Sequence, residues 1–186
     1  QESFENVKPI AGEVADKFYE ILFEDYPGSD GLFANVDMPT QKKLLINSLV
    51  YVVEHLEDSQ ALGKYLMNMG GRHTDYGTQE EHYDWVGLSL LKTFAHFFGD
   101  GWTEELNGAW AEAYSVIASV MKQGAQERLA SESDEENSQP SESPVEEDDN
   151  VVHLNKGSQV SENSSIQINL TDEIKDQIRF AVRESI

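Results

Sequence analysis

The sequence has no cysteine among its 186 residues. Disulfide bonds, thiolate metal sites and cysteine nucleophiles are therefore excluded. Basic residues are scarce as well, because only 13 Lys and Arg stand against 35 Asp and Glu, which gives a formal net charge of −22. A charge of this sign and size repels nucleic acids and anionic membrane surfaces, so we expect neither of them as a partner.

Long apolar runs are also missing. No stretch reaches the roughly 20 apolar residues that a membrane-spanning helix needs, and the first residues show no signal-peptide pattern. We therefore expect a cytoplasmic protein. Because the sequence starts at Gln1, within a helical pattern, we also expect that a few N-terminal residues are missing.

Apolar residues recur at helical spacing through the first two thirds of the chain. Thr78 and Glu81 form a predicted capping box at the start of one helix. No strand pattern interrupts the series, so we predict an all-α domain over residues 1–126. Its expected helical segments are 1–26, 40–56, 59–72, 78–98 and 103–126.

The composition changes after this domain. Residues 131–150 contain nine acidic residues, five serines and two prolines but no basic residue. Such a stretch cannot bury enough apolar surface to offset chain entropy, so we predict a disordered acidic linker over 127–162. In the tail, 163–186, residues 166–170 alternate like a short strand, and an amphipathic helix follows from Thr171. The sequence leaves open whether the tail docks on the domain, binds a partner or stays mobile.

Few motifs for enzyme chemistry are present. None of the five histidines forms a zinc-type cluster with carboxylates, and no Gly-rich phosphate loop or Gly-x-Ser-x-Gly motif occurs. His73 closes an apolar helical segment, where a single inward histidine could be the axial ligand of a large apolar cofactor. A histidine at a helix end is more often a partner of the helix dipole, so the pattern alone favours that explanation.

Four separated segments carry a family resemblance, at residues 18–23, 32–33, 71–87 and 109–118. In order, spacing and residue type, they resemble the single-domain bacterial haemoglobins and the haem domain of flavohaemoglobins. The resemblance covers residues 1–126. It implies a globin fold, a 3-over-3 helical sandwich, and haem b as the cofactor.

The resemblance also assigns roles to individual residues. It implies that His73 ligates the haem iron, that Tyr83 orients it, and that Tyr19 donates a hydrogen bond to bound oxygen. Gln41 matches the polar residue of the second distal helix, although a shorter preceding loop leaves Lys42 or Lys43 as alternatives. Five further residues are expected to line the haem: Phe33, Leu45, Leu49, Val86 and Tyr114.

One position departs from the family pattern. Flavohaemoglobins carry a glutamate on the last helix, behind the histidine and the tyrosine, whereas Ala125 stands there in this sequence. A carboxylate would push electron density onto the imidazole and favour oxygen activation. Its absence favours reversible oxygen binding over peroxidase-like chemistry and weakens the case for an enzyme. Residues 127–186 are also too few and too polar for a flavin or nicotinamide module.

We therefore expect a haem globin that binds dioxygen reversibly, for transport or storage. It could also remove nitric oxide as a dioxygenase, with electrons from a separate reductase; carbon monoxide is a further expected ligand. The alternative is a haem-based gas sensor that signals through its C-terminal tail. A third option is a globin fold that has lost haem and serves as an interaction module. The sequence leaves a homodimer open.

Overall fold

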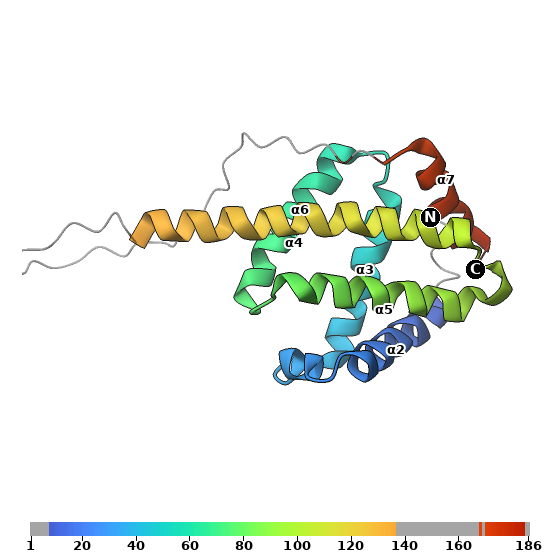
Figure 1. The fold of residues 1–186 in the computed structure, drawn as a ribbon, viewed down its shortest axis with the longest axis horizontal. Coiled ribbons are helices and arrows are strands. Elements are labelled where there is room, and N and C mark those ends of the chain that lie inside the picture. Colours follow the sequence, from blue (N-terminus) through green and yellow to red (C-terminus); the bar gives the residue numbers. More distant parts are fainter. Residues whose placement is uncertain (1–7, 137–167, 169, 185–186) are drawn as a thin grey trace, which may run out of the picture.

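The computed structural model describes residues 8–136, 168 and 170–184 (Figure 1). Their helices confirm the all-α class, because no strand occurs in this part of the chain. Of the predicted strand at 166–170, only Ile168 and Leu170 are described, and neither belongs to a strand. The elements are α2 (Lys8–Asp25), η1 (Ser29–Phe33), α3 (Met38–Glu54), α4 (Ser59–Asp75), α5 (Glu80–Phe98), η2 (Gly99–Gly101), α6 (Glu104–Glu136) and α7 (Asp172–Glu184).

Side chains before the helices fix where they start. The carboxylate of Asp58 accepts a hydrogen bond from the Ala61 N–H at 2.9 Å and caps α4. The prediction that Thr78 caps α5 was wrong. The cap is Gln79, whose backbone N–H donates to His82 Nδ1 at 3.0 Å, so His82 takes the place expected for Glu81.

The last helix of the body, α6, is longer than predicted. It continues to Glu136, ten residues past the expected end of the domain, and projects beyond the other helices (Figure 1). Bonds between residues four apart support this extension, including Arg128 Nε to Glu132 Oε1 at 2.7 Å. Residues 127–136 are thus helical where we expected disorder. The segment 137–162 of the predicted linker lies outside the described residues.

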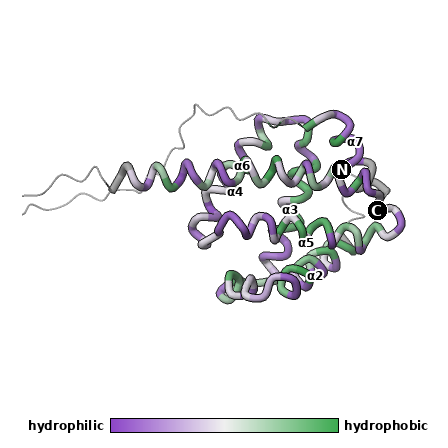
Figure 2. The backbone as a smooth tube through the Cα atoms, in the orientation of Figure 1, coloured by the Kyte–Doolittle hydropathy of each residue, from purple (hydrophilic) through white to green (hydrophobic). Residues whose placement is uncertain are grey.

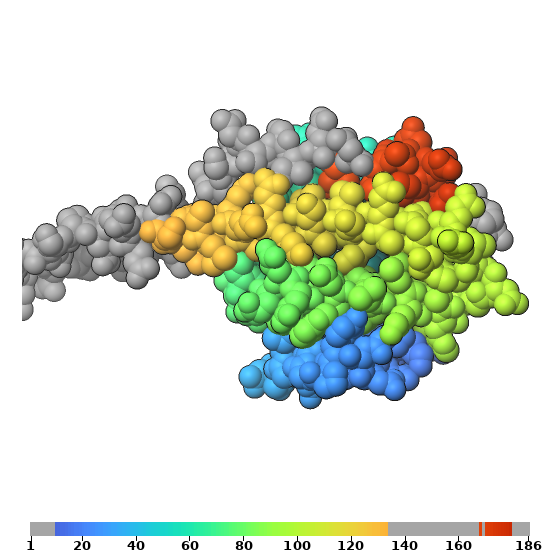
Figure 3. Space-filling model, viewed as in Figure 1, coloured from blue at the N-terminus to red at the C-terminus, as the bar shows by residue number. Residues whose placement is uncertain are grey.

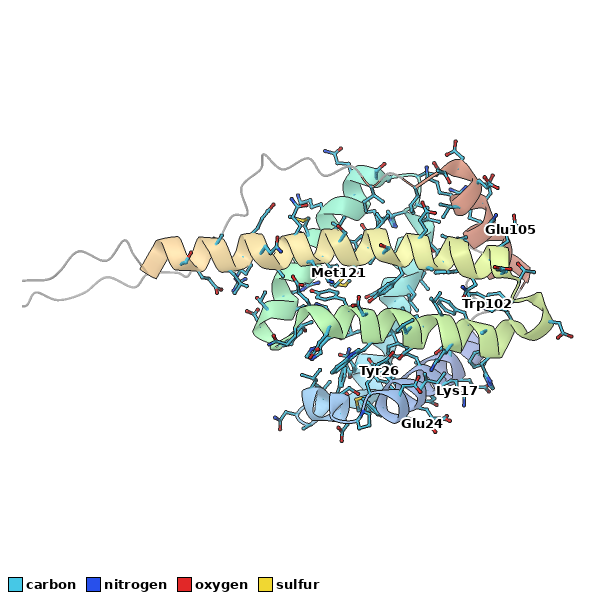
Figure 4. The ribbon with its side chains drawn as sticks, viewed as in Figure 1. Lys17, Glu24, Tyr26, Trp102, Glu105 and Met121 are labelled. Atoms are coloured by element: carbon cyan, nitrogen blue, oxygen red, sulfur yellow. The ribbon has the colours of Figure 1, made fainter. Side chains whose placement is uncertain are left out.

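Glycines allow α4 and α6 to pack with their backbones in close contact. A Cβ atom added to Gly70 would lie 1.9 Å from the Met121 carbonyl oxygen, and one added to Gly124 would lie 2.1 Å from the Met67 carbonyl oxygen. No larger residue fits at either place without moving a helix. Met121 is labelled on α6 in Figure 4, where α4 passes behind it. This contact fixes the end of α4, one turn before His73.

Two apolar clusters form the core. The first joins α3, α4, α5, α6 and α7, and the second joins α2, α3, α5, α6 and η1. Figure 2 shows hydrophobic stretches along α2 and α5, which pack against each other. No helix in the described ranges is both long and apolar enough to cross a membrane.

Candidate functional site

His73 lies near the end of α4 with a defined ring orientation. Its Nδ1 lies 2.7 Å from the Met69 carbonyl oxygen. Because a carbonyl oxygen only accepts, Nδ1 carries the hydrogen, and the Nε2 lone pair stays available. Burial lowers the pKa of His73, and the nearby charge of Arg72 lowers it further, although the bond to Met69 opposes both. The ring is therefore neutral at neutral pH, the form that ligates a metal.

Tyr83, near the start of α5, lies beside this histidine. The two ring centroids are 6.3 Å apart, with 29° between the ring planes. Tyr83 is only 6% exposed, and its hydroxyl has no hydrogen-bond partner among the described residues. Burial raises the pKa of Tyr83, so the hydroxyl stays protonated. An unpaired buried hydroxyl costs about 1–3 kcal/mol, which a ligand that bonds to it would recover.

Tyr114 of α6 connects Tyr83 to the second apolar cluster. Its hydroxyl donates to the Tyr83 carbonyl oxygen at 2.6 Å. Burial, helped by Tyr83 and Asp84, raises the pKa of Tyr114 strongly, so the hydroxyl remains a donor. The ring rests on Gly87, where an added Cβ would lie 2.4 Å from a carbon of the Tyr114 ring. Gly87 is thus required for the position of Tyr114.

Tyr19 lies on α2, in the second apolar cluster. It is 4% exposed and meets the ring of Phe33 edge to face, with centroids 5.4 Å apart. Burial raises the pKa of Tyr19, and a hydrogen bond with the Gln41 side chain partly opposes this. Lys42 instead pairs with Asp16 at the surface, with Nζ 2.5 Å from Oδ1. The structure therefore brings Gln41 to Tyr19 and turns Lys42 away.

The residues expected to line the cofactor gather in the second cluster. Phe33, Leu45, Leu49, Val86 and Tyr114 all pack there against a buried set that includes Tyr19 and Leu90. An apolar cavity adjoins them between α3, α5 and α6. Its lining residues are Leu49, Val52, Gly87, Leu90, Leu91, Phe94, Trp110, Tyr114 and Ile117.

Only Leu49 and Tyr114 of these lining residues were predicted as site residues, and sequence reasoning missed the other seven. Leu90 and Phe94 follow Val86 at intervals of four, so they continue the same face of α5 toward the cavity. That spacing was visible in the sequence, where both residues read as ordinary core. The cavity between three helices could not be seen there, because it depends on how α3, α5 and α6 cross.

The arrangement suits a flat, largely apolar cofactor whose metal takes one protein ligand. It offers a neutral imidazole with an unpaired buried hydroxyl beside it, and a second cluster in which aromatic and aliphatic residues surround the Tyr19–Gln41 pair. The apolar cavity is lined by neither His73 nor Tyr19. Among the described residues, no group of three or more His, Cys, Asp or Glu side chains could hold a metal ion together.

Comparisons with known proteins agree with this geometry. The Globin family profile matches residues 16–121. The flavohemoprotein of Bacillus thuringiensis is 32% identical over 108 residues, which cover 57% of this chain and 26% of that protein. The anaerobic nitrite reductase HBII of Casuarina glauca is 28% identical over 134 residues, covering 64% of this chain and 84% of that protein. This chain thus spans about a quarter of the flavohemoprotein, and it belongs to the globin family.

Proposed function

We propose that this globin binds haem b, with His73 Nε2 as the protein ligand of the iron. The observation that carries the proposal is the bond from His73 Nδ1 to the Met69 carbonyl, because it fixes the tautomer and directs one free lone pair. The family and the flavohemoprotein relatives support haem as the cofactor. Bound haem would supply the iron that takes up dioxygen.

The distal residues would then act on a ligand at the opposite face. Tyr19 is a buried, protonated donor, and the Gln41 side chain lies within hydrogen-bonding reach of its hydroxyl. A donor fixed in advance stabilises a ligand that gains negative charge. Phe33, Leu45 and Leu49 would exclude water around that ligand.

Reversible dioxygen binding is the use that this site favours. The proximal side carries Ala125 at the expected carboxylate position, and the cation Lys122 lies over the Tyr83 ring, with Nζ 5.5 Å from the ring centroid. Neither residue pushes electron density toward His73. The test is to titrate the reduced protein with oxygen and then to remove the oxygen by purging with argon. We expect the oxygenated spectrum to form and to reverse, and immediate oxidation to the ferric form would contradict the proposal.

Nitric oxide removal with electrons from a separate reductase is the second candidate. Its support is the likeness to flavohemoproteins, of which this chain matches about a quarter. Stopped-flow mixing of the oxygenated protein with nitric oxide separates the two uses. Fast, stoichiometric nitrate formation would favour dioxygenation, and slow or absent formation would favour storage or transport. The cytoplasmic location and the homodimer stay predictions.

A further inference from the structure

The tail residues in the described ranges are part of the core. Ile168, Leu170, Ile174 and Ile178 are each at most 8% exposed and belong to the first apolar cluster. Ile174 and Ile178 lie one helical turn apart on α7, so they form one apolar face. Figure 3 shows α7, in red, seated against the first part of α6. The surface under α7 is therefore apolar and would face water without it.

Charged side chains hold α7 on both sides of this surface. Lys175 and Arg179, four residues apart, both pair with Glu57 in the turn between α3 and α4; the Lys175 Nζ to Glu57 Oε2 distance is 3.6 Å. On the other side, Gln177 Nε2 donates to Glu105 Oε1 at 2.9 Å. Glu105, labelled in Figure 4, lies at the start of α6. The contacts are complementary in both shape and charge.

The chain segment that connects the end of α6 to α7 is long. α6 has 33 residues, so it is about 50 Å long. α7 lies near the start of α6, whereas the chain leaves α6 at its far end. The 31 residues between Glu136 and Ile168 reach at most about 110 Å. They therefore suffice for the return, and α7 meets its surface as a helix on a long connection rather than through a tight turn.

We propose that the surface between Glu57 and Glu105 is a helix-binding site, and that residues 168–184 of this chain occupy it as a separable ligand. The connection gives α7 a local concentration on the order of millimolar, which favours its own surface over that of another molecule. This proposal does not depend on what the pocket binds. The buried cluster under α7 includes Leu56 in the turn after α3 and Leu62 and Leu66 of α4, the helix that carries His73.

The test uses the full chain with Ile174→Asp and Ile178→Asp, which breaks the apolar face of α7. A labelled synthetic peptide of residues 166–186 is then titrated, and its anisotropy is followed. We expect saturable binding to the variant and binding at least tenfold weaker to the wild-type chain, whose site is already occupied. The control peptide carries the same two Asp substitutions and should not bind. Equal binding to both chains, or no binding to the variant, would overturn the proposal.

A second set of variants keeps the test decisive if that chain fails to fold. Glu57→Lys places a cation against Lys175 and Arg179 at an exposed position. This change should speed proteolysis within α7, because it weakens the contact of the tethered helix, and adding Lys175→Glu and Arg179→Glu should reverse the effect. No effect of Glu57→Lys would contradict the site. Dimers of the wild-type chain that disappear in the Ile174→Asp, Ile178→Asp chain would assign the occupant to a second copy and overturn docking within one chain.

Discussion

Tyr19 and Tyr83 are buried tyrosines in different apolar clusters, but only Tyr19 has a side-chain partner. Gln41 bonds to Tyr19, whereas the Tyr83 hydroxyl is unpaired within the described chain and Lys122 lies over its ring. On the proximal side, His73 is oriented by a backbone carbonyl. The distal side is thus organised by a side-chain pair, and the proximal side by the backbone of α4. This difference predicts that the two sides respond to different kinds of substitution.

The largest effect is expected from Gly70→Ala, which breaks the proximal side through the backbone. The new Cβ would meet the Met121 carbonyl oxygen at 1.9 Å, so α4 must move and carry His73 with it. We expect a loss of about 3 kcal/mol in the free energy of unfolding, measured by urea denaturation.

Gly71→Ala is the matched control for this change. An added Cβ there would have its nearest neighbours at 3.6 and 3.7 Å, which are ordinary contacts. Alanine also favours a helix over glycine by up to about 1 kcal/mol. We therefore expect unchanged or slightly higher stability. Equal destabilisation by the two substitutions would refute the importance of the close contact between α4 and α6.

A smaller effect, confined to the distal side, is expected from Tyr19→Phe. The ring packing stays, but the donor that faces a bound ligand is lost. A hydrogen bond to a ligand with developing charge contributes about 1.5–3 kcal/mol, so oxygen should dissociate roughly tenfold faster or more. Flash photolysis or stopped flow measures this rate. Tyr83→Phe should change it far less, and the reverse order would show that the two sides were assigned wrongly.

The smallest effect is expected from Lys122, through the electrostatics of the proximal side. A cation near Tyr83 favours the ferrous form of a bound haem, because the ferric form carries one more positive charge. Lys122→Met should lower the midpoint potential, and Lys122→Glu should lower it further. Spectroelectrochemical titration measures the change. A rise in potential for Lys122→Glu would contradict this account of the proximal side.

Local patterns predicted much of the fold. Apolar spacing placed α3, α4, α5 and the first part of α6 within a few residues of their ends. The resemblance of short segments to the globin family predicted that Tyr19, Phe33 and Gln41 belong to one site, although they lie apart in the sequence. The cap of α5 was mistaken because Thr78 and Gln79 are adjacent candidates, and the choice depends on the direction of the His82 ring.

Long-range contacts could not be predicted in the same way. Gly70 and Gly124 meet backbone atoms of residues more than 50 positions away, and nothing in the local sequence marks such a contact. The apolar face of α7 was visible, but its docking surface is assembled from the turn after α3 and the start of α6. Only the folded chain shows that these pieces form one surface.

The visible absorption spectrum of the full chain mixed with haem tests the central claim most directly. We predict a Soret band that shifts on reduction and again with carbon monoxide, in the wild-type chain and in the control His82→Ala, which removes the cap of α5 and a ring contact with Trp85. His73→Ala should lose this spectrum. A colourless wild-type chain would show that this globin does not bind haem, and an unchanged spectrum in His73→Ala would show that His73 is not the ligand.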